Sequence, residues 1–291
     1  MHYLLFVVTA LIWGAAFFLM KKASFAFGPL TIGAASTFGG ALVMGLFWAL
    51  KREPWRIRRR HLSTLVVVSV LGYIFPYAVQ PFLVQLIGHG FVGMLVSLVP
   101  ILTILVSIPL LGVLPSRTQL IGVLGGIVCI ALMVVDGLDR NAGMFHLMLA
   151  VSVPFCYAVS NTLVQKSLHD VSPITTVTIF MAAAAVALTP LSLLFETITV
   201  DEHLMTAVGA IVLLSIFARG VAMLLFYKLI QSKGPLFAGM VTYVIPAEAL
   251  LWSWLDNERI SSIQLAAIAV VLLMVGIVQR DIIRRSLKTA D

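Results

Sequence analysis

Two ionisable residues stand within long stretches that otherwise contain almost no charge. Arg219 interrupts the run from His203 to Ile230, and Glu248 interrupts the run from Pro235 to Leu255. A charged side chain at the centre of a bilayer costs about 3 kcal/mol or more, and such residues by default mark a functional site. An arginine there could hold a carboxylate, and a glutamate could hold an amine or take up a proton. The alternative is a static ion pair that fastens two helices together.

Aromatic and amide side chains supply further candidates for contact with a solute. Trp13 and Tyr157 lie at matching places in the two halves of the chain, and aromatic faces attract cations and stack on rings. Tyr157, Ser160 and Asn161 share one helical face by their spacing. That face is more polar than lipid tolerates, so we expect Tyr157 and Asn161 to point inward. Trp13 could equally serve in packing or in an interfacial belt.

Two prolines predict a broken helix that lines a cavity. Pro76 and Pro81 free backbone carbonyls and bend their helix. Such breaks persist where a neighbour or a cavity satisfies the freed groups. Tyr77 and Gln80 lie between the two prolines and are therefore candidates for substrate contact, unless the bend only shapes the bundle.

Prolines also recur in two later apolar runs. Pro100 and Pro246 predict similar bends, and bent helices beside a site at the midplane suit a gate. Tyr243 comes shortly before Pro246 and is a further candidate for the lining.

The composition defines the elements that must hold these residues. Of the 291 residues, 61% are hydrophobic and 11% are charged, whereas an ordinary soluble domain carries about 25% charged residues. A soluble globule and a disordered chain are both excluded by these values. The net charge of +7 comes from short basic runs between apolar stretches. This pattern orients membrane proteins and does not indicate binding of nucleic acid.

Apolar runs predict ten transmembrane helices, because one crossing needs about 20 apolar residues. The segment from Leu62 to Ser116 is long enough for two crossings, with a turn at Gly88-His89-Gly90. The start of the chain lacks the basic residues and the cleavage site of a signal peptide, so we expect the first helix to be retained. The expected spans cover residues 3–20, 23–50, two within 62–116, 118–135, 141–165, 171–195, 203–230, 235–255 and 260–279.

Basic residues predict the orientation. With the amino terminus in the cytoplasm, fourteen lysines and arginines fall on the cytoplasmic side and four on the other side. This asymmetry follows the positive-inside rule, so both termini are predicted to be cytoplasmic. The pair Lys21-Lys22 is the one local contradiction.

The two halves of the chain repeat each other at an offset of 144 to 146 residues. Gly28-Pro29-Leu30-Thr31 is matched by Ser172-Pro173-Ile174-Thr175, and Pro100 is matched by Pro246. Each half holds five spans, so the second half must cross in the opposite sense, an arrangement that transporters use. We expect repeats at 3–136 and 141–280 and a cytoplasmic tail at 281–291. Further matched pairs are Trp13 with Tyr157, Lys22 with Lys166, Gly88 with Gly234, Tyr73 with Arg219, and Leu102 with Glu248.

At these motifs the chain resembles the EamA domain and the ten-helix branch of the drug/metabolite transporter superfamily. The resemblance covers both halves. It rests on Leu11 to Phe17, Pro29, Ser97 to Pro100, Gly112 with Gly122, Tyr243 to Pro246, and Asn257-Glu258. It implies an inner-membrane carrier, often an exporter of amino acids, related metabolites or cationic compounds. Many relatives have Gly-Glu after both the fourth and the ninth span, whereas the first copy here reads Gly112-Val113. Many also have an arginine where this chain has Ser36.

The sequence therefore predicts an all-α membrane carrier of two inverted five-helix repeats, working by alternating access. The expected substrates are amino acids or related amphipathic and cationic compounds, moved outward, with Glu248 as a candidate for proton coupling. The alternatives are an intramembrane lipid-modifying enzyme and a channel, but no catalytic cluster or ring of like residues supports either. We expect no cofactor and no metal, because the histidines lack ligand spacing. The expected partners are a small molecule and the bilayer, with the chain a monomer or homodimer.

Overall fold

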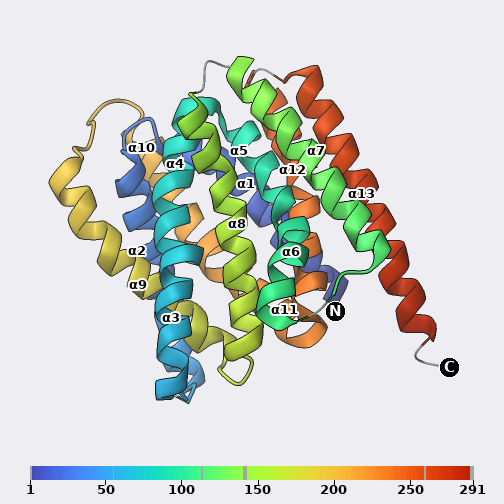
Figure 1. Ribbon diagram of the computed structural model, residues 1–291. Helices are drawn as coiled ribbons and strands as arrows, with labels where there is room; N and C mark the ends of the chain where they lie inside the picture. The colour runs from blue at the N-terminus through green and yellow to red at the C-terminus, as the bar shows by residue number, and fades with distance from the viewer. Residues whose placement is uncertain (1, 55, 113, 140–142, 259, 289–291) are drawn as a thin grey trace.

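The structure is a computed structural model that describes residues 2–54, 56–112, 114–139, 143–258 and 260–288, with side chains left out at some positions near the carboxyl end. Every regular element among these residues is a helix. In Figure 1 the helices run side by side between an upper and a lower face, and α7 and α13 pack together along one edge. The predicted all-α class is confirmed.

The first half of the chain crosses between the two faces five times. Its third crossing combines η1, α3, η2 and α4, and its fourth combines α5, η3 and α6. The elements are α1 (His2–Ala23), α2 (Pro29–Lys51), η1 (Arg59–His61), α3 (Leu62–Ser69), η2 (Val70–Ile74), α4 (Phe75–Ile87), α5 (His89–Leu95), η3 (Val96–Leu98), α6 (Val99–Leu111) and α7 (Arg117–Asp139).

The second half follows the same order of elements. The elements are α8 (Met144–Ser167), α9 (Pro173–Phe195), α10 (Leu204–Leu213), η4 (Leu214–Val221), α11 (Ala222–Gly239), η5 (Met240–Tyr243), α12 (Ile245–Leu255) and α13 (Ser262–Lys288). Among the described residues, eight helices are long and apolar enough to cross a membrane, and they coincide with the first eight predicted spans. The ninth and tenth predicted spans correspond to the region from the end of α11 to α12, and to α13.

The turn between the third and fourth spans lies where the sequence predicted it. Gly88 separates α4 from α5 with a φ of 95°, a conformation that glycine adopts without strain. The second half differs at the equivalent place. Helix α11 is continuous as far as Gly239, so no break in the helix marks the predicted boundary after Ile230.

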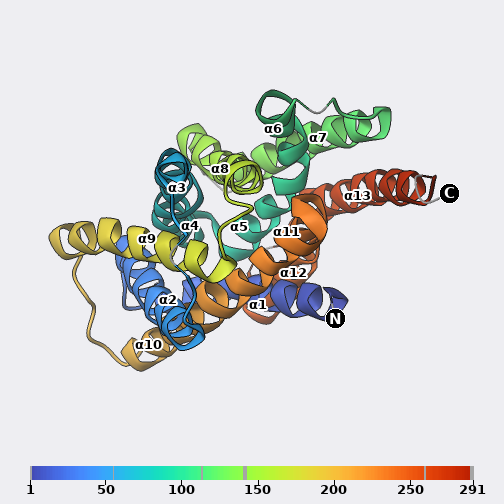
Figure 2. The same cartoon turned by 90° about the horizontal axis from the view of Figure 1, so that it is seen from below.

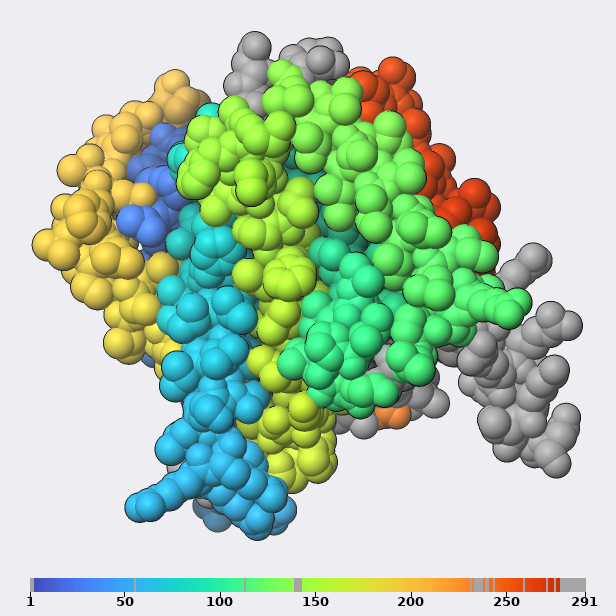
Figure 3. All heavy atoms as spheres, in the orientation of Figure 1, coloured from blue at the N-terminus to red at the C-terminus, as the bar shows by residue number. Residues whose placement is uncertain are grey.

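The outer surface of the bundle is apolar, as lipid requires. Leu120, Leu124 and Ile127 of α7 and Val186 of α9 are among many large hydrophobic side chains that are exposed. Figure 3 shows the face on which α3, α8 and α7 lie next to one another. An apolar surface of this extent belongs against lipid. Helix α1 contacts α5, α10, α11 and α12, and the view from below in Figure 2 shows it beside α11 and α12.

Matching irregular segments relate the two halves. A π-helical segment interrupts the third span at η2 and the eighth span at η4, and a 3₁₀ turn precedes both α6 and α12. Pro100 and Pro246 each occupy the first turn of the helix that follows the 3₁₀ turn, a position where proline is tolerated because its missing N–H has no intrahelical partner. The internal repeat predicted from single residues is therefore visible in the backbone.

Glycine allows two close helix approaches that matter for the interior. A Cβ atom at Gly40 of α2 would lie 2.6 Å from Cβ of Arg219 in η4, and one at Gly125 of α7 would lie 2.2 Å from Met274 of α13. Small residues at such crossings let helix backbones approach closely. The second contact packs α7 against α13 within one chain.

Candidate functional site

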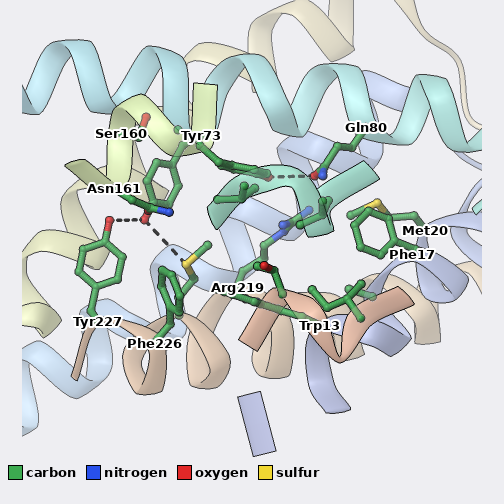
Figure 4. A pocket seen from close by; sticks show the side chains of 18 residues that line it. Trp13, Phe17, Met20, Tyr73, Gln80, Ser160, Asn161, Arg219, Phe226 and Tyr227 are labelled. Carbon is green, nitrogen blue, oxygen red and sulfur yellow. Dashed lines mark hydrogen bonds between the residues drawn. The ribbon is translucent and has the colours of Figure 1, made fainter. Parts of the chain in front are cut away.

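An internal cavity lies between the two repeats, and five of the predicted contact residues line it. These five are Trp13, Gln80, Tyr157, Asn161 and Arg219. They come from α1, α4, α8 and η4, so both halves contribute. Figure 4 shows Arg219 in the middle of the cavity, with Tyr73, Phe226 and Tyr227 towards one end and Phe17 and Met20 towards the other. The walls are thus mainly aromatic and apolar, with few polar groups.

Arg219 is buried, and no counter-ion for it is found within the described part of the chain. The residue is 4% exposed, and neither Nε nor Nη2 of its guanidinium group has a hydrogen-bond partner among the described residues. The guanidinium carbon lies 3.6 Å from the centre of the Tyr77 ring, in cation–π contact. Tyr77 does not line the cavity itself, so its predicted role changes from direct contact to support of the arginine. A buried guanidinium with free donors is arranged to receive an anionic oxygen.

The π-helical segment η4 explains how the backbone presents this arginine. A π turn widens the helix and leaves a carbonyl without its usual partner, and such turns occur often at functional sites. In η4 the carbonyl oxygen of Ala218 accepts a hydrogen bond from Nε1 of Trp13 at 3.3 Å. Trp13 thus supports the irregular backbone of η4. Its ring also packs against Phe226, with ring centroids 4.7 Å apart.

Polar contacts join the two repeats across the cavity. The hydroxyl group of Tyr157 donates to Oε1 of Gln80 at 3.0 Å, and the hydroxyl groups of Tyr73 and Tyr227 lie 2.8 Å apart. Figure 4 draws both contacts. Because each contact links one residue of the first half to one of the second, movement of the halves against each other must break or replace them.

Glu248 occupies a separate position. It is buried but does not line the cavity, and its Oε1 has no hydrogen-bond partner. A Cβ atom at Gly14 would lie 1.7 Å from Oε2 of Glu248, so the carboxyl group rests against the bare backbone of α1. Arg219 and Glu248 are both described by the structure and form no ion pair with each other. The static ion pair that the sequence left open is therefore not found.

The four predicted prolines fall outside the cavity. Pro76 and Pro81 lie in α4 directly after the π segment η2, and Pro100 and Pro246 begin α6 and α12. All four mark irregular helix positions, and their role in a gate stays a prediction. The side chain of Tyr243 lies outside the described residues.

Sequence reasoning missed several aromatic residues of the lining. Phe226 and Tyr227 follow Arg219 by seven and eight positions, which places them on the same helical face. Tyr73 is the repeat partner of Arg219, and this pairing was a usable signal. No group of three or more His, Cys, Asp or Glu side chains that could hold a metal occurs within the described part of the chain.

Comparison with known proteins gives the family. The model of the EamA-like transporter family matches residues 1–135 and again residues 144–279. The chain belongs to the EamA-like transporter family. It is therefore a multi-pass integral membrane protein and a transporter, and it is not an enzyme. The two matches also show that the family's domain occurs twice, once in each half.

Two known proteins are similar to the EamA-like chain over most of its length. The uncharacterized transporter YoaV of Bacillus subtilis (strain 168) is 21% identical over 261 residues, which cover 88% of both chains. A protein of known crystal structure is similar with a TM-score of 0.67, at 19% identity and with 98% of both chains covered. At this identity the second likeness shows the fold alone.

Proposed function

We propose that this EamA-like protein is a secondary transporter that exports small amphipathic metabolites, with amino acids as the first candidates. The observation that carries the proposal is the buried Arg219 guanidinium, whose free donors point into an aromatic cavity between the repeats. A solute carboxylate would satisfy those donors, and the solute's apolar body would lie against Phe17, Phe226 and Tyr73. Movement of the two repeats around a central site would give alternating access.

The orientation of the export is part of the proposal. The positive-inside asymmetry of the sequence supports both termini in the cytoplasm of a bacterial inner membrane. The even number of crossings supports a common side for the start of α1 and the end of α13, which both lie at the lower face in Figure 1. In this orientation, a cavity that opens at the lower face would load from the cytoplasm.

Counterflow in proteoliposomes tests the proposed site. A panel of amino acids and aromatic acids is loaded inside, and the exchange of a labelled member is followed. Arg219→Ala should lower the exchange of carboxylate-bearing members about 10- to 100-fold, because a hydrogen bond to a charged group contributes about 1.5–3 kcal/mol. Arg117→Ala is the matched control, since Arg117 is exposed. Equal exchange by the Arg219→Ala protein and the parent would remove Arg219 from the site, and exchange that never saturates would indicate a channel.

Glu248 is proposed to couple transport to protons. Its carboxyl group is buried, lacks a partner at Oε1 and lies against α1 near the cavity. Burial without a partner disfavours the charged form of a carboxyl group, so such a group can take up a proton and carry it. Glu248→Gln should therefore abolish uptake driven by an imposed pH gradient while counterflow persists. The coupling role fails if the pH gradient still drives uptake in the Glu248→Gln protein.

A further inference from the structure

A network of ionic side chains closes the upper face of the bundle, where α1 ends and α12 ends. Nζ of Lys21 lies 2.8 Å from Oδ2 of Asp256, and Nζ of Lys22 lies 2.8 Å from Oδ1 of the same residue. Nζ of Lys21 also lies 3.5 Å from Oε1 of Glu258. The lysines end α1 and the two acids follow α12, so the network, called here the ionic latch, fastens the first helix of one repeat to the fourth helix of the other.

Glu258 extends the latch to the start of α5. Its carboxylate accepts hydrogen bonds from the backbone N–H groups of His89 and Gly90, at 3.0 and 2.9 Å, and from the hydroxyl group of Ser253 at 2.9 Å. Glycines flank His89 for a steric reason. A Cβ atom at Gly88 would lie 2.5 Å from Glu258, and one at Gly90 would lie 2.0 Å from Ser253. Helices α1, α5 and α12 are therefore held together at one point.

The lower face lacks acids at the positions equivalent to those of this network, and an ion pair that it does contain, Arg60 with Asp170, has a largely exposed arginine. The internal repeat pairs Lys22 with Lys166, Asp256 with Leu110 and Glu258 with Gly112. Lys166 does occupy the equivalent place, but its Nζ donates to the backbone carbonyl of Leu110 at 2.6 Å. Both faces therefore have the lysine of the latch. At these paired positions, the upper face alone also has the carboxylate partners.

The cavity is also closed more thinly towards the lower face. A second hollow lies between α8, α9 and α11, and it is lined by Gln165, His169 and Tyr227 among others. Tyr227 lines the central cavity as well. The side chain of Tyr227 and its hydrogen bond to Tyr73 therefore separate the two spaces. Tyr227 is the residue that the two spaces share among those described, whereas four charged groups and three helices meet at the upper face.

We propose that the ionic latch is the gate of the upper face, and that its absence from the lower face makes the resting carrier open preferentially towards the face that holds both termini. The inference rests on the proposed alternating-access function. It also explains why Lys21 and Lys22 depart from the positive-inside pattern, because both are engaged with Asp256. In the orientation proposed above, the resting carrier would face the cytoplasm and its substrates.

Access of a thiol reagent to the cavity tests the gate without any substrate. Cys129 and Cys156 are replaced by alanine, and a reporter cysteine is placed in the cavity by Ser160→Cys. A membrane-impermeant maleimide is then applied to sealed vesicles of either orientation. In this background we expect labelling from the lower face to be at least tenfold faster than labelling from the upper face.

Opening the latch should change that ratio. The pair Asp256→Asn with Glu258→Gln should raise labelling from the upper face at least tenfold. Glu202→Gln is the matched control, because Glu202 lies on the same face with a side chain that is 87% exposed and lies 3.7 Å from His203. The charge swap Lys22→Asp with Asp256→Lys should return labelling towards the parent rate. The proposal is overturned if the protein with Asp256→Asn and Glu258→Gln is labelled from the upper face at the parent rate. It is also overturned if Glu202→Gln raises that rate equally.

A latch can also be added to the lower face while the native one stays intact. Leu110→Asp would offer Lys166 a carboxylate in place of the backbone carbonyl. We expect labelling from the lower face to fall about tenfold, and an unchanged rate would count against the asymmetry. These readouts are independent of transport. Shifted labelling without any counterflow would support the gate and refute the proposed function, and counterflow with unshifted labelling would do the reverse.

Discussion

Arg219 lies inside the protein against a tyrosine ring, and the described residues offer it no carboxylate partner. A desolvated cation–π contact contributes about 2 kcal/mol, which is less than the cost of about 3 kcal/mol or more for a charge at the bilayer centre. The ring of Tyr77 therefore compensates for only part of the cost of the guanidinium. The free Nε and Nη2 atoms are the donors that the proposed function assigns to an anionic solute.

Substitution of Tyr77 tests this supporting role. Tyr77→Leu removes the aromatic face under Arg219, and we expect counterflow of carboxylate-bearing solutes to fall about tenfold. Tyr77→Phe is the matched control and should transport normally, because it keeps the ring. The Phe variant should also be as stable as the parent or more stable in thermal unfolding, because the Tyr77 hydroxyl group is buried without a partner. Equal losses in the two variants would show that the hydroxyl group matters and the ring face does not.

The site residues divide into those that the sequence could reveal and those that it could not. Arg219 and Glu248 stand out because charge is rare in apolar runs, and Tyr157 and Asn161 stand out through helical spacing. Tyr77 lies one position after a proline, so it was predicted as lining, although the structure places it beneath the arginine. The direction of a side chain near a π turn depends on the local widening of the helix, and ordinary helical spacing does not report it.

At the scale of elements, α2 holds the π segment η4 in place through two adjacent glycines. A Cβ atom at Gly39 would lie 2.5 Å from Oγ of Ser215, and one at Gly40 would lie 2.6 Å from Cβ of Arg219. Both Ser215 and Arg219 belong to η4. The close approach of α2 therefore fixes the segment that carries the arginine.

Gly40→Ala should displace η4. Its new methyl group would meet Cβ of Arg219, which is part of a packed helix and not the free end of a flexible side chain. Overpacking of this kind costs about 1–3 kcal/mol, so we expect a lower midpoint of thermal unfolding in detergent and a loss of counterflow. Gly45→Ala on the same helix is the control, because a Cβ atom there meets nothing within 4 Å. A Gly40→Ala protein as stable and active as Gly45→Ala would refute this contact.

The elements themselves were largely predictable, because spans are long apolar runs bounded by charges and by Gly-Pro or Gly-His turns. The eight spans with sufficient length and apolar character match the predictions, as does the turn at Gly88. The π segments, the 3₁₀ turns and the continuation of α11 to Gly239 were not predicted. All of these are helical variants with the same composition, so hydropathy cannot distinguish them from α-helix.

For the whole molecule, the ionic latch implies a definite response to pH. Burial raises the pKa of Asp256, but hydrogen bonds from Lys21 and Lys22 outweigh it and hold the pKa below the ordinary 3.8. Burial likewise raises the pKa of Glu258, and the backbone N–H of Gly90, with His89, Ser253 and Lys21, lowers it below 4.5. A depressed folded-state pKa means that the stabilisation is complete above the unfolded value and is lost as the pH falls through the folded value.

Labelling of the reporter cysteine from the upper face should therefore stay constant between about pH 5 and pH 8 and should rise only below about pH 4. His89 faces both carboxylates, and a proton gained there as the pH falls would add a third cation to the network and help to hold it closed. The measurement is the maleimide labelling rate as a function of pH, corrected for thiolate formation with a free thiol. Faster labelling at pH 6 than at pH 8 after that correction would contradict this account of the latch.

The paired π segments bear on the history of the protein. A π turn amounts to one residue inserted into an α-helix, and Val70 and Leu214, where the two segments begin, are 144 positions apart, the same offset that relates the repeats. Two independent insertions at one equivalent place are less parsimonious than one. We infer that the insertion already existed in a five-helix ancestor before its gene was duplicated and fused.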